Sequence, residues 1–353
     1  MERVAEVSAR LERGIRERVF PGCVCVLVDG DAREEIALGH FMYDAHSPRV
    51  NAHTRYDVAS VTKVMASMLL LSQLVDEGVV GLETKLSQVL PDFANSPFRA
   101  DVSVLHLLTY TVPFAAAHSK ELRQGKTPEE FGTALRARDL VAWPGSAYCY
   151  SNVTAYWATL LVEHIAKKTL PELFYEKIAR PLGLATATWS IDPSERYTIP
   201  PTEVTEVRGE VRGIVHDESS EYLAHAGHAM GAAGLFASAG DSATFLAMAL
   251  CGGVSKDGVR IVSDEMVARW VQDQLPSIAT PTPCMWSDDQ NVRAQKLGPQ
   301  VIHKGGFTGC MMLGDMTTRK GFVLLSNRTY PTRPKDSRAF VSVWEEVARL
   351  VLL

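Results

Sequence analysis

The chain has 353 residues, of which 46% are hydrophobic and 22% charged, and its formal net charge is −5. These values are ordinary for a globular protein, exclude a disordered chain, and allow one large or two medium domains. The small negative charge gives no electrostatic reason to expect nucleic acid or an anionic membrane as a partner, so a small-molecule ligand fits better.

The amino terminus lacks the pattern of an export signal. Charged residues recur at nearly every turn of residues 2–18, without an uninterrupted apolar run. No later stretch is long and apolar enough to span a bilayer. The six cysteines are scattered without a Cys-x-x-Cys pair, which favours free thiols in a reducing compartment. We therefore expect a cytoplasmic protein with no membrane partner, unless a leader has been removed.

The amino-terminal part predicts a helix and then a β-hairpin. Residues 2–18 have an amphipathic helical period that stops before Pro21. Residues 23–28 and 34–40 read as two strands joined by a turn at 29–31. A long helix is expected to follow a loop, with Ser60 in its first turn and Gly78 as its stop.

In the rest of the chain, predicted helices are followed by predicted strands. Helices are expected at 82–90, 104–108, 128–138, 155–168, 242–250 and 263–270, and a polar, irregular region at 190–230 looks like a long loop over a site. Strands are expected at 301–307, 310–316 and 321–327, before a closing helix at 337–352.

This order predicts an α+β fold, in which an antiparallel sheet built from both chain ends is flanked by helices and a mainly helical domain is inserted in the middle. We expect residues 1–75 and 235–353 to form the sheet domain and residues 76–234 the helical domain, with the active site in the cleft between them.

The first stretch with chemical potential is the segment 57–63, which contains Ser60 and Lys63. A three-residue spacing places two side chains on one helix face, so the Lys63 amine can reach the Ser60 hydroxyl. A lysine in apolar surroundings has a lowered pKa and can take the proton of a serine nucleophile. Ser-x-x-Lys also recurs by chance, so the motif needs further context.

Two later stretches supply that context. Tyr150 and Asn152 lie in a turn at 144–152 that leads into a helix, and Asn152 suits the N-cap, although packing and capping alone explain such residues. Lys304 is followed by Gly305 and Gly306, which leave a strand backbone open to a ligand. Because neighbouring strand residues face opposite sides, we expect Lys304 to face the site, and His303 to be a packing residue.

Together and in this order, the three stretches resemble the motifs of the serine β-lactamase and penicillin-binding-protein superfamily, most closely its branch of class C β-lactamases, D-alanyl-D-alanine carboxypeptidases and serine esterases. Ser60 and Lys63 match the Ser-x-x-Lys motif, residues 150–152 match Tyr-x-Asn, and residues 304–306 match Lys-Thr-Gly or His-x-Gly. The resemblance extends from about residue 20 to the end of the chain.

The resemblance implies a role for each matching residue. Ser60 would attack a carbonyl carbon and form an acyl-enzyme, while Lys63 and Tyr150 shuttle the proton. Lys304 would supply a second ammonium beside the phenol, and Asn152 would orient Lys63 and bind the acyl side chain.

The backbone N–H groups of Ser60 and Phe307 would form the oxyanion hole, and Gly305 and Gly306 would line the substrate. Gly305 lacks the hydroxyl with which β-lactam-recognising members bind a substrate carboxylate, so strong β-lactamase activity is not expected. Residues 110–113 replace the usual His-Thr-Ser-Gly and are expected to alter a loop away from the nucleophile.

These departures and the missing export signal favour a serine esterase or amidase of a small-molecule ester or amide. An acyltransferase, a D-alanyl peptidase or β-lactamase, and a non-catalytic ligand-binding relative stay open as alternatives. The natural substrate and the oligomeric state stay open too.

No cofactor and no metal are expected. The sequence has neither a Gly-x-Ser-x-Gly elbow nor a His-Glu-x-x-His motif, so an α/β-hydrolase and a zinc protease have little support. His225 and His228 could offer two metal ligands, but no spaced carboxylate or cysteine completes the set. We expect this pair, His216 and Asp217 to belong to the loop that shapes the acyl pocket.

Overall fold

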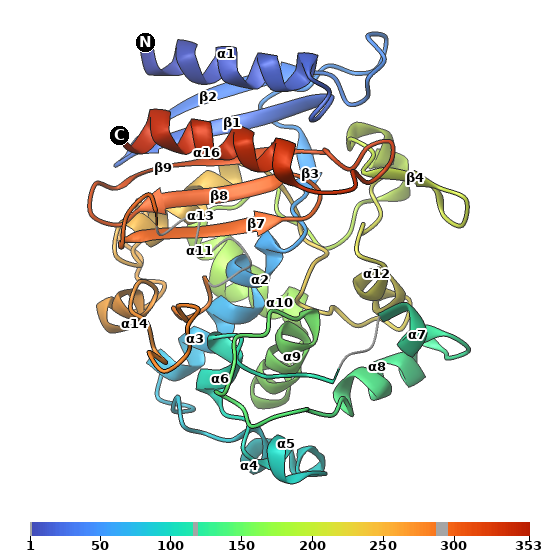
Figure 1. The fold of residues 1–353 in the computed structure, drawn as a ribbon, viewed down its shortest axis with the longest axis vertical. Coiled ribbons are helices and arrows are strands. Elements are labelled where there is room, and N and C mark those ends of the chain that lie inside the picture. The colour runs from blue at the N-terminus through green and yellow to red at the C-terminus, as the bar shows by residue number, and fades with distance from the viewer. Residues whose placement is uncertain (1, 116–118, 287–295) are drawn as a thin grey trace.

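The structure is a computed structural model that describes residues 2–115, 119–286 and 296–353. Its main sheet takes strands β1 (Gly22–Asp29) and β2 (Ala32–Gly39) from one end of the chain, and β7 (Val301–Gly306), β8 (Cys310–Asp315) and β9 (Lys320–Ser326) from the other. The strands are antiparallel in the order β2-β1-β9-β8-β7 (Figure 1). The predicted α+β fold, with a sheet built from both chain ends, is confirmed.

The remaining elements surround this sheet or form the middle of the chain. Two short antiparallel pairs join β3 (Arg55–Asp57) to β6 (Phe236–Ser238) and β4 (Glu203–Thr205) to β5 (Gly209–Val211). The α-helices are α1 (Glu2–Arg16), α2 (Val61–Met65), α3 (Ser67–Asp76), α4 (Leu86–Val89), α5 (Pro97–Ala100), α6 (Val104–Leu108), α7 (Ser119–Arg123), α8 (Pro128–Arg136), α9 (Asn152–Ala166), α10 (Leu170–Phe174), α11 (Arg180–Leu182), α12 (Glu218–Ala224), α13 (Ala239–Leu250), α14 (Asp264–Arg269) and α16 (Arg338–Leu352). Tighter or wider helical turns occur at Pro91–Phe93, Tyr175–Ala179 and Pro193–Thr198.

Both faces of the sheet are covered, which explains why β1 is apolar at nearly every position. Its alternate residues enter two different cores: Val24 and Val26 join the core that includes α13, whereas Cys23 and Cys25 join the core under α1 and α16. The period of two along a strand sends neighbouring side chains to opposite faces. Helices α1 and α16 lie side by side on the second face (Figure 1).

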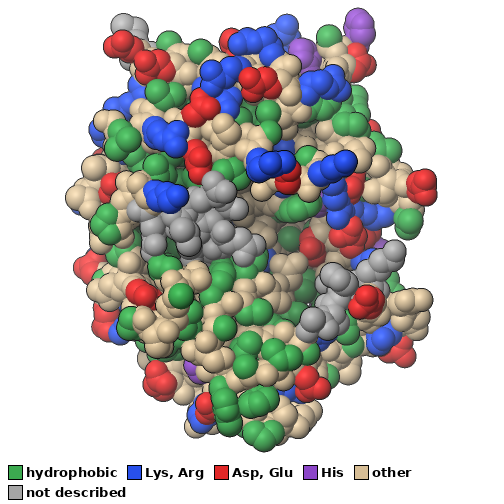
Figure 2. Space-filling model, viewed as in Figure 1, with side chains coloured by type: hydrophobic (Ala, Val, Ile, Leu, Met, Phe, Trp, Pro, Cys, Tyr) green, Lys and Arg blue, Asp and Glu red, His purple; other side chains and the backbone are tan. Residues whose placement is uncertain are grey.

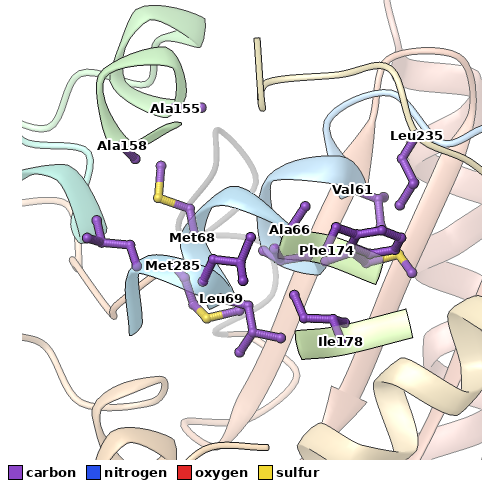
Figure 3. Packing of buried hydrophobic residues seen from close by; sticks show 14 of the residues in the cluster. Val61, Ala66, Met68, Leu69, Ala155, Ala158, Phe174, Ile178, Leu235 and Met285 are labelled. Atoms are coloured by element: carbon purple, nitrogen blue, oxygen red, sulfur yellow. The ribbon is translucent and has the colours of Figure 1, made fainter. Parts of the chain in front are cut away.

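The helical part of the chain packs around α3 and α9. Met68 and Leu69 of α3 are fully buried, and Ala155 and Ala158 of α9 are small enough to let the two helices approach closely (Figure 3). Burying a side chain of this size contributes about 1.5–3 kcal/mol. In the described ranges, no helix combines the length and the apolar character that crossing a membrane requires.

The structure corrects three details of the predicted helices. The helix after Ser60 is broken at Ala66, whose φ of −132° and ψ of −87° are not helical, so α2 and α3 are separate. Next to the break, the Ser67 hydroxyl donates to the carbonyl of Gly231 at 2.8 Å, which ties α3 to a distant loop. The helix predicted at 82–90 is only α4, because Lys85 forms a bridge with Ser103 instead. The irregular region 190–230 contains β4, β5 and α12.

Candidate active site

A tight turn presents Ser60 at the start of α2. Ser60 is half-buried and is the N-cap of that helix. The residue before it, Ala59, has a φ of +46°, a left-handed conformation that costs a non-glycine residue about 1–3 kcal/mol. The buried carboxylate of Asp57 stabilises this conformation by accepting hydrogen bonds from the Ala59 N–H at 2.8 Å and from the His216 N–H at 2.7 Å. The segment before α2 is therefore held from two directions.

The environment of Asp57 also connects this turn to the edge of the main sheet. Burial raises the pKa of Asp57 to about 6, although its two N–H partners oppose that rise. The Thr308 hydroxyl, in the turn between β7 and β8, donates to the carbonyl oxygen of Asp57 at 2.8 Å. The turn that follows β7 is thus fastened to the residue that braces the Ser60 turn.

Lys63 lies within hydrogen-bond distance of Ser60. Its Nζ is 3.0 Å from the Ser60 Oγ, 2.9 Å from Asn152 Oδ1 and 2.8 Å from the Ala232 carbonyl oxygen. The side chain is fully buried, and an ammonium group has three protons to donate. The three acceptors therefore hold the amine directly at the serine hydroxyl.

Two lysines lie against the ring of Tyr150. The Nζ of Lys63 is 5.1 Å from the ring centre, and the Nζ of Lys304 is 4.5 Å from it. Lys304, on β7, is fully buried and lies against Tyr150, as the predicted strand register requires. His303, the neighbouring residue on the strand, is also buried. Two nearby ammonium groups favour the ionised form of a phenol, and cation–π attraction to the ring adds to the contact.

Asn152 is not the N-cap that the sequence predicts. Ser151 caps α9, with its Oγ accepting a hydrogen bond from the Val153 N–H at 3.1 Å. The Asn152 side chain is free to bridge instead: its Oδ1 accepts from Lys63, and its Nδ2 donates to Asp217 Oδ2 at 3.0 Å. Sequence reasoning placed Asp217 only in a nearby loop, and its contact with Asn152 could not be read from spacing.

Tyr110 lies beside the site, so the prediction that residues 110–113 alter a loop away from the nucleophile is wrong. Its ring centre is 5.1 Å from that of Tyr150 and 4.8 Å from the Nζ of Lys304. The Cys149 N–H donates to the Tyr110 carbonyl at 2.8 Å, which joins the two loops. The replacement of the His-Thr-Ser-Gly pattern was the signal available in the sequence.

The end of β7 is packed against the Ser60 turn. A Cβ atom added to Gly306 would lie 2.5 Å from the Val58 carbonyl oxygen, so only glycine allows this approach. Gly305 pairs with Met311 in the adjacent strand, and Phe307 follows with half of its side chain exposed. Among the described residues, the N–H groups of Ser60 and Phe307 donate to no other protein group.

The face of the molecule shown in Figure 2 divides into two parts. In that view, Lys and Arg side chains gather over the upper half, where the sheet lies, and hydrophobic side chains are more frequent over the helical lower half. The described ranges contain no group of three or more His, Cys, Asp or Glu residues that could hold a metal ion.

Comparison with known proteins agrees with this arrangement. The pattern of the Beta-lactamase family matches residues 7–342. The chain belongs to the beta-lactamase family. The resemblance inferred from the three motifs is confirmed, and membership identifies the chain as a serine hydrolase of this family.

Individual relatives are distant in sequence. A Salmonella schwarzengrund protein named "Putative D-alanyl-D-alanine carboxypeptidase" is 27% identical over 84% of this chain and 76% of its own length. Among solved structures, EstCE1, described as a hydrolase with promiscuous acyltransferase activity, has a TM-score of 0.75 at 19% identity, covering 98% of this chain and 97% of its own. Simvastatin synthase (LovD) from Aspergillus terreus has a TM-score of 0.77 at 18% identity, with coverage of 99% and 98%. These structures share the fold.

Proposed function

We propose that this serine hydrolase is an esterase or amidase that acts on a small-molecule ester or amide through an acyl-enzyme on Ser60. The observation that carries the proposal is the 3.0 Å separation between the Nζ of Lys63 and the Oγ of Ser60 in a buried setting. A nucleophile at hydrogen-bond distance from a group that can relay its proton, with a third group that orients the relay, is an arrangement that activates a serine.

In the proposed reaction, the Ser60 oxygen attacks the substrate carbonyl carbon while its proton passes to Lys63 or Tyr150. Lys304 stabilises the phenolate form of Tyr150, which accepts this proton directly or by way of Lys63, and the resulting phenol then gives it to the leaving group. The backbone N–H groups of Ser60 and Phe307 bind the oxygen that becomes negative, since both are open donors in the described part of the chain. Water then attacks the acyl carbon and releases the acid.

We propose that Asn152, Gly305 and Gly306 bind the substrate. Gly305 favours a substrate without a carboxylate. Gly305 offers no hydroxyl to bind such a group next to Lys304. We therefore expect hydrolysis of nitrocefin, a β-lactam, to be slower than that of p-nitrophenyl butyrate by at least about a hundredfold, which corresponds to ~3 kcal/mol of transition-state binding.

The test compares labelling and turnover in matched serine variants. The wild type should gain the mass of a fluorophosphonate on Ser60 and hydrolyse p-nitrophenyl butyrate, and Ser60→Ala should lose both. Ser146→Ala, which changes an exposed serine of the Tyr150 loop, should retain both. If Ser60 of the wild type is inert, the protein is instead a non-catalytic relative that binds a ligand.

Acyl transfer is a second candidate, because EstCE1 is described as a hydrolase with promiscuous acyltransferase activity and LovD is named a synthase. Hydrolysis and transfer would use the same residues and differ only in the acceptor. Adding alcohols or amines during turnover distinguishes them: transfer yields a new ester or amide at the expense of free acid, whereas hydrolysis yields acid alone.

We propose a cleft between the sheet domain (1–75 and 235–353) and the helical domain (76–234) as the place where the substrate binds. A cytoplasmic location is supported by the six cysteines, all of which are free thiols.

A further inference from the structure

A separate cavity of about 230 Å³ is lined by residues just after α1, by the loop after β9 and by the first turn of α16. Its walls include Arg18, Tyr43, Arg328, Tyr330 and Phe340, and we call it the Arg328 pocket. None of these residues was singled out by the motifs, and none contacts Ser60 or Lys63 through the bonds described above. The pocket therefore needs an explanation of its own.

Arg328 is a buried cation beside which the described residues place no counter-ion. Its side chain is only 9% exposed, and its Nε is fully buried with no hydrogen-bond partner. In the part of the chain that the structure describes, no carboxylate lies within ion-pair distance of its guanidinium group. An arginine stays charged under all ordinary conditions, and burying an unpaired charge is costly. The position thus favours binding of an anion from outside.

Aromatic rings hold this guanidinium group in place. Its Cζ lies 5.1 Å from the ring centre of Phe307 and 5.7 Å from that of Phe340. The aliphatic stem packs on Gly309, where an added Cβ would come within 2.9 Å of the Arg328 Cγ. A guanidinium fixed in this way is pre-organised for the two parallel hydrogen bonds that a carboxylate accepts.

A second arginine and two tyrosines complete the pocket. The Cζ of Arg18 lies 4.1 Å from the ring centre of Tyr43, and the rings of Tyr43 and Tyr330 are stacked with their centres 6.5 Å apart. Asp336 is the one acidic residue in the described wall, and its Oδ2 is already bound by Arg338 Nη2 at 2.7 Å. The wall thus combines positive charge with flat apolar surfaces.

We propose that the Arg328 pocket binds a small aromatic carboxylate at a site separate from Ser60. The carboxylate pairs with Arg328 and Arg18, and its ring packs against Tyr43, Tyr330 and Phe340. A ligand of one or two rings suits the volume of about 230 Å³. This binding does not depend on the chemistry proposed for Ser60.

The test measures binding of sodium benzoate by calorimetry to the Ser60→Ala protein, in which turnover plays no part. Benzoate should bind, and benzamide, which has the same ring without the charge, should bind at least about tenfold more weakly, because the ion pair is lost. Arg328→Met and Arg18→Met should each weaken benzoate binding by about tenfold or more. Arg16→Met, on the exposed side of α1, should leave it unchanged.

Four results would overturn the proposal. Benzoate could fail to bind, or it could bind equally well to both the Arg328→Met and Arg18→Met proteins. Binding that is lost in Lys304→Met and kept in Arg328→Met would assign benzoate to the Ser60 side. Inorganic phosphate binding as tightly as benzoate would show that the rings contribute nothing. Because Arg18 is exposed and lies just after the end of α1, Arg18→Met keeps the test valid even if Arg328→Met fails to fold.

Discussion

The carboxylate of Asp217 accepts a hydrogen bond from the Nδ2 of Asn152 at 3.0 Å. An amide has one accepting and one donating end, so this bond fixes the Asn152 Oδ1 toward the Nζ of Lys63, 2.9 Å away. Asp217 therefore controls the orientation of a group in contact with Lys63 without touching Ser60 itself. We regard it as a positioning residue.

Asp217→Asn should lower kcat by about tenfold, equivalent to ~1.4 kcal/mol. An asparagine can still cap α12. Its amide has only one accepting oxygen, however, so either the Asn152 Nδ2 or the Ser220 N–H must then meet another donor. The measurement is the pH dependence of kcat, whose lower limb should shift because Lys63 has lost a fixed acceptor. Asp192→Asn, at another cap, should leave kcat and the pH profile as they are. An unshifted profile in Asp217→Asn would contradict a positioning role.

Tyr110→Leu should reduce kcat/KM by about two- to thirtyfold, because removing a ring 4.8 Å from the Nζ of Lys304 removes ~0.5–2 kcal/mol of cation–π attraction. Tyr110→Phe keeps the ring and should stay within about twofold of the wild type if the ring face is what matters. Steady-state kinetics with p-nitrophenyl butyrate compares the two. Equal losses in both variants would assign the effect to the hydroxyl.

Gly306→Ala should strongly reduce activity and destabilise the protein by about 1–3 kcal/mol, since the new Cβ would lie 2.5 Å from the Val58 carbonyl oxygen. Either β7 or the segment before Ser60 must move. Urea unfolding measures the free energy of unfolding, and fluorophosphonate labelling measures the reactivity of Ser60. Gly81→Ala is the control, because its nearest neighbour would be 3.7 Å away. Normal labelling in Gly306→Ala would show that this close approach does not position Ser60.

His216 should make the folded state less stable in acid. Burial, with a contribution from Arg333, lowers its pKa to about 3, whereas an unfolded histidine titrates near 6.5. As the pH falls from 6.5 to 3, the unfolded chain takes up a proton that the folded protein does not, so the stability contributed by His216 is lost over that range. Asp57 acts in the opposite direction, because its pKa is raised to about 6 and the folded protein takes up its proton first.

The His216→Gln variant separates these two effects. Going from pH 7 to about pH 4.5, the wild type should lose about 3 kcal/mol of unfolding free energy relative to the variant, since each pKa unit corresponds to about 1.4 kcal/mol. Urea unfolding at the two pH values provides the measurement. A difference between the two proteins that does not change with pH would mean that His216 titrates normally in the folded state.

Much of the site could be predicted because its residues fall in short, ordered motifs. The spacing of Ser60 and Lys63 predicts their contact, and strand alternation selects Lys304 over His303. The strands at both ends of the chain predicted the sheet. The domain boundaries at 75 and 235 stay a prediction. Helix α2 packs against β7 of the sheet, whereas α3, which ends at Asp76, packs against α9.

What escaped prediction depends on contacts between distant segments. Local propensity made Asn152 an N-cap, yet Ser151 takes that position because the Asn152 amide is bound by Lys63 and Asp217. The helix formers around Ala66 gave no sign of the break, which adjoins the contact between Ser67 and Gly231. Tyr110 reaches the site through loop packing that no period in the sequence records.

The pairing of β1 with β9, in which Val26 lies opposite Val323, sets the order in which the chain can assemble during synthesis. The ribosome releases the first hairpin early, but that hairpin cannot complete its hydrogen-bonding ladder until β9 has been synthesised. Long-range closure of this kind slows folding and leaves an apolar strand edge exposed in the meantime. Until β9 is available, the open edge of β1 can therefore pair with a strand of another chain.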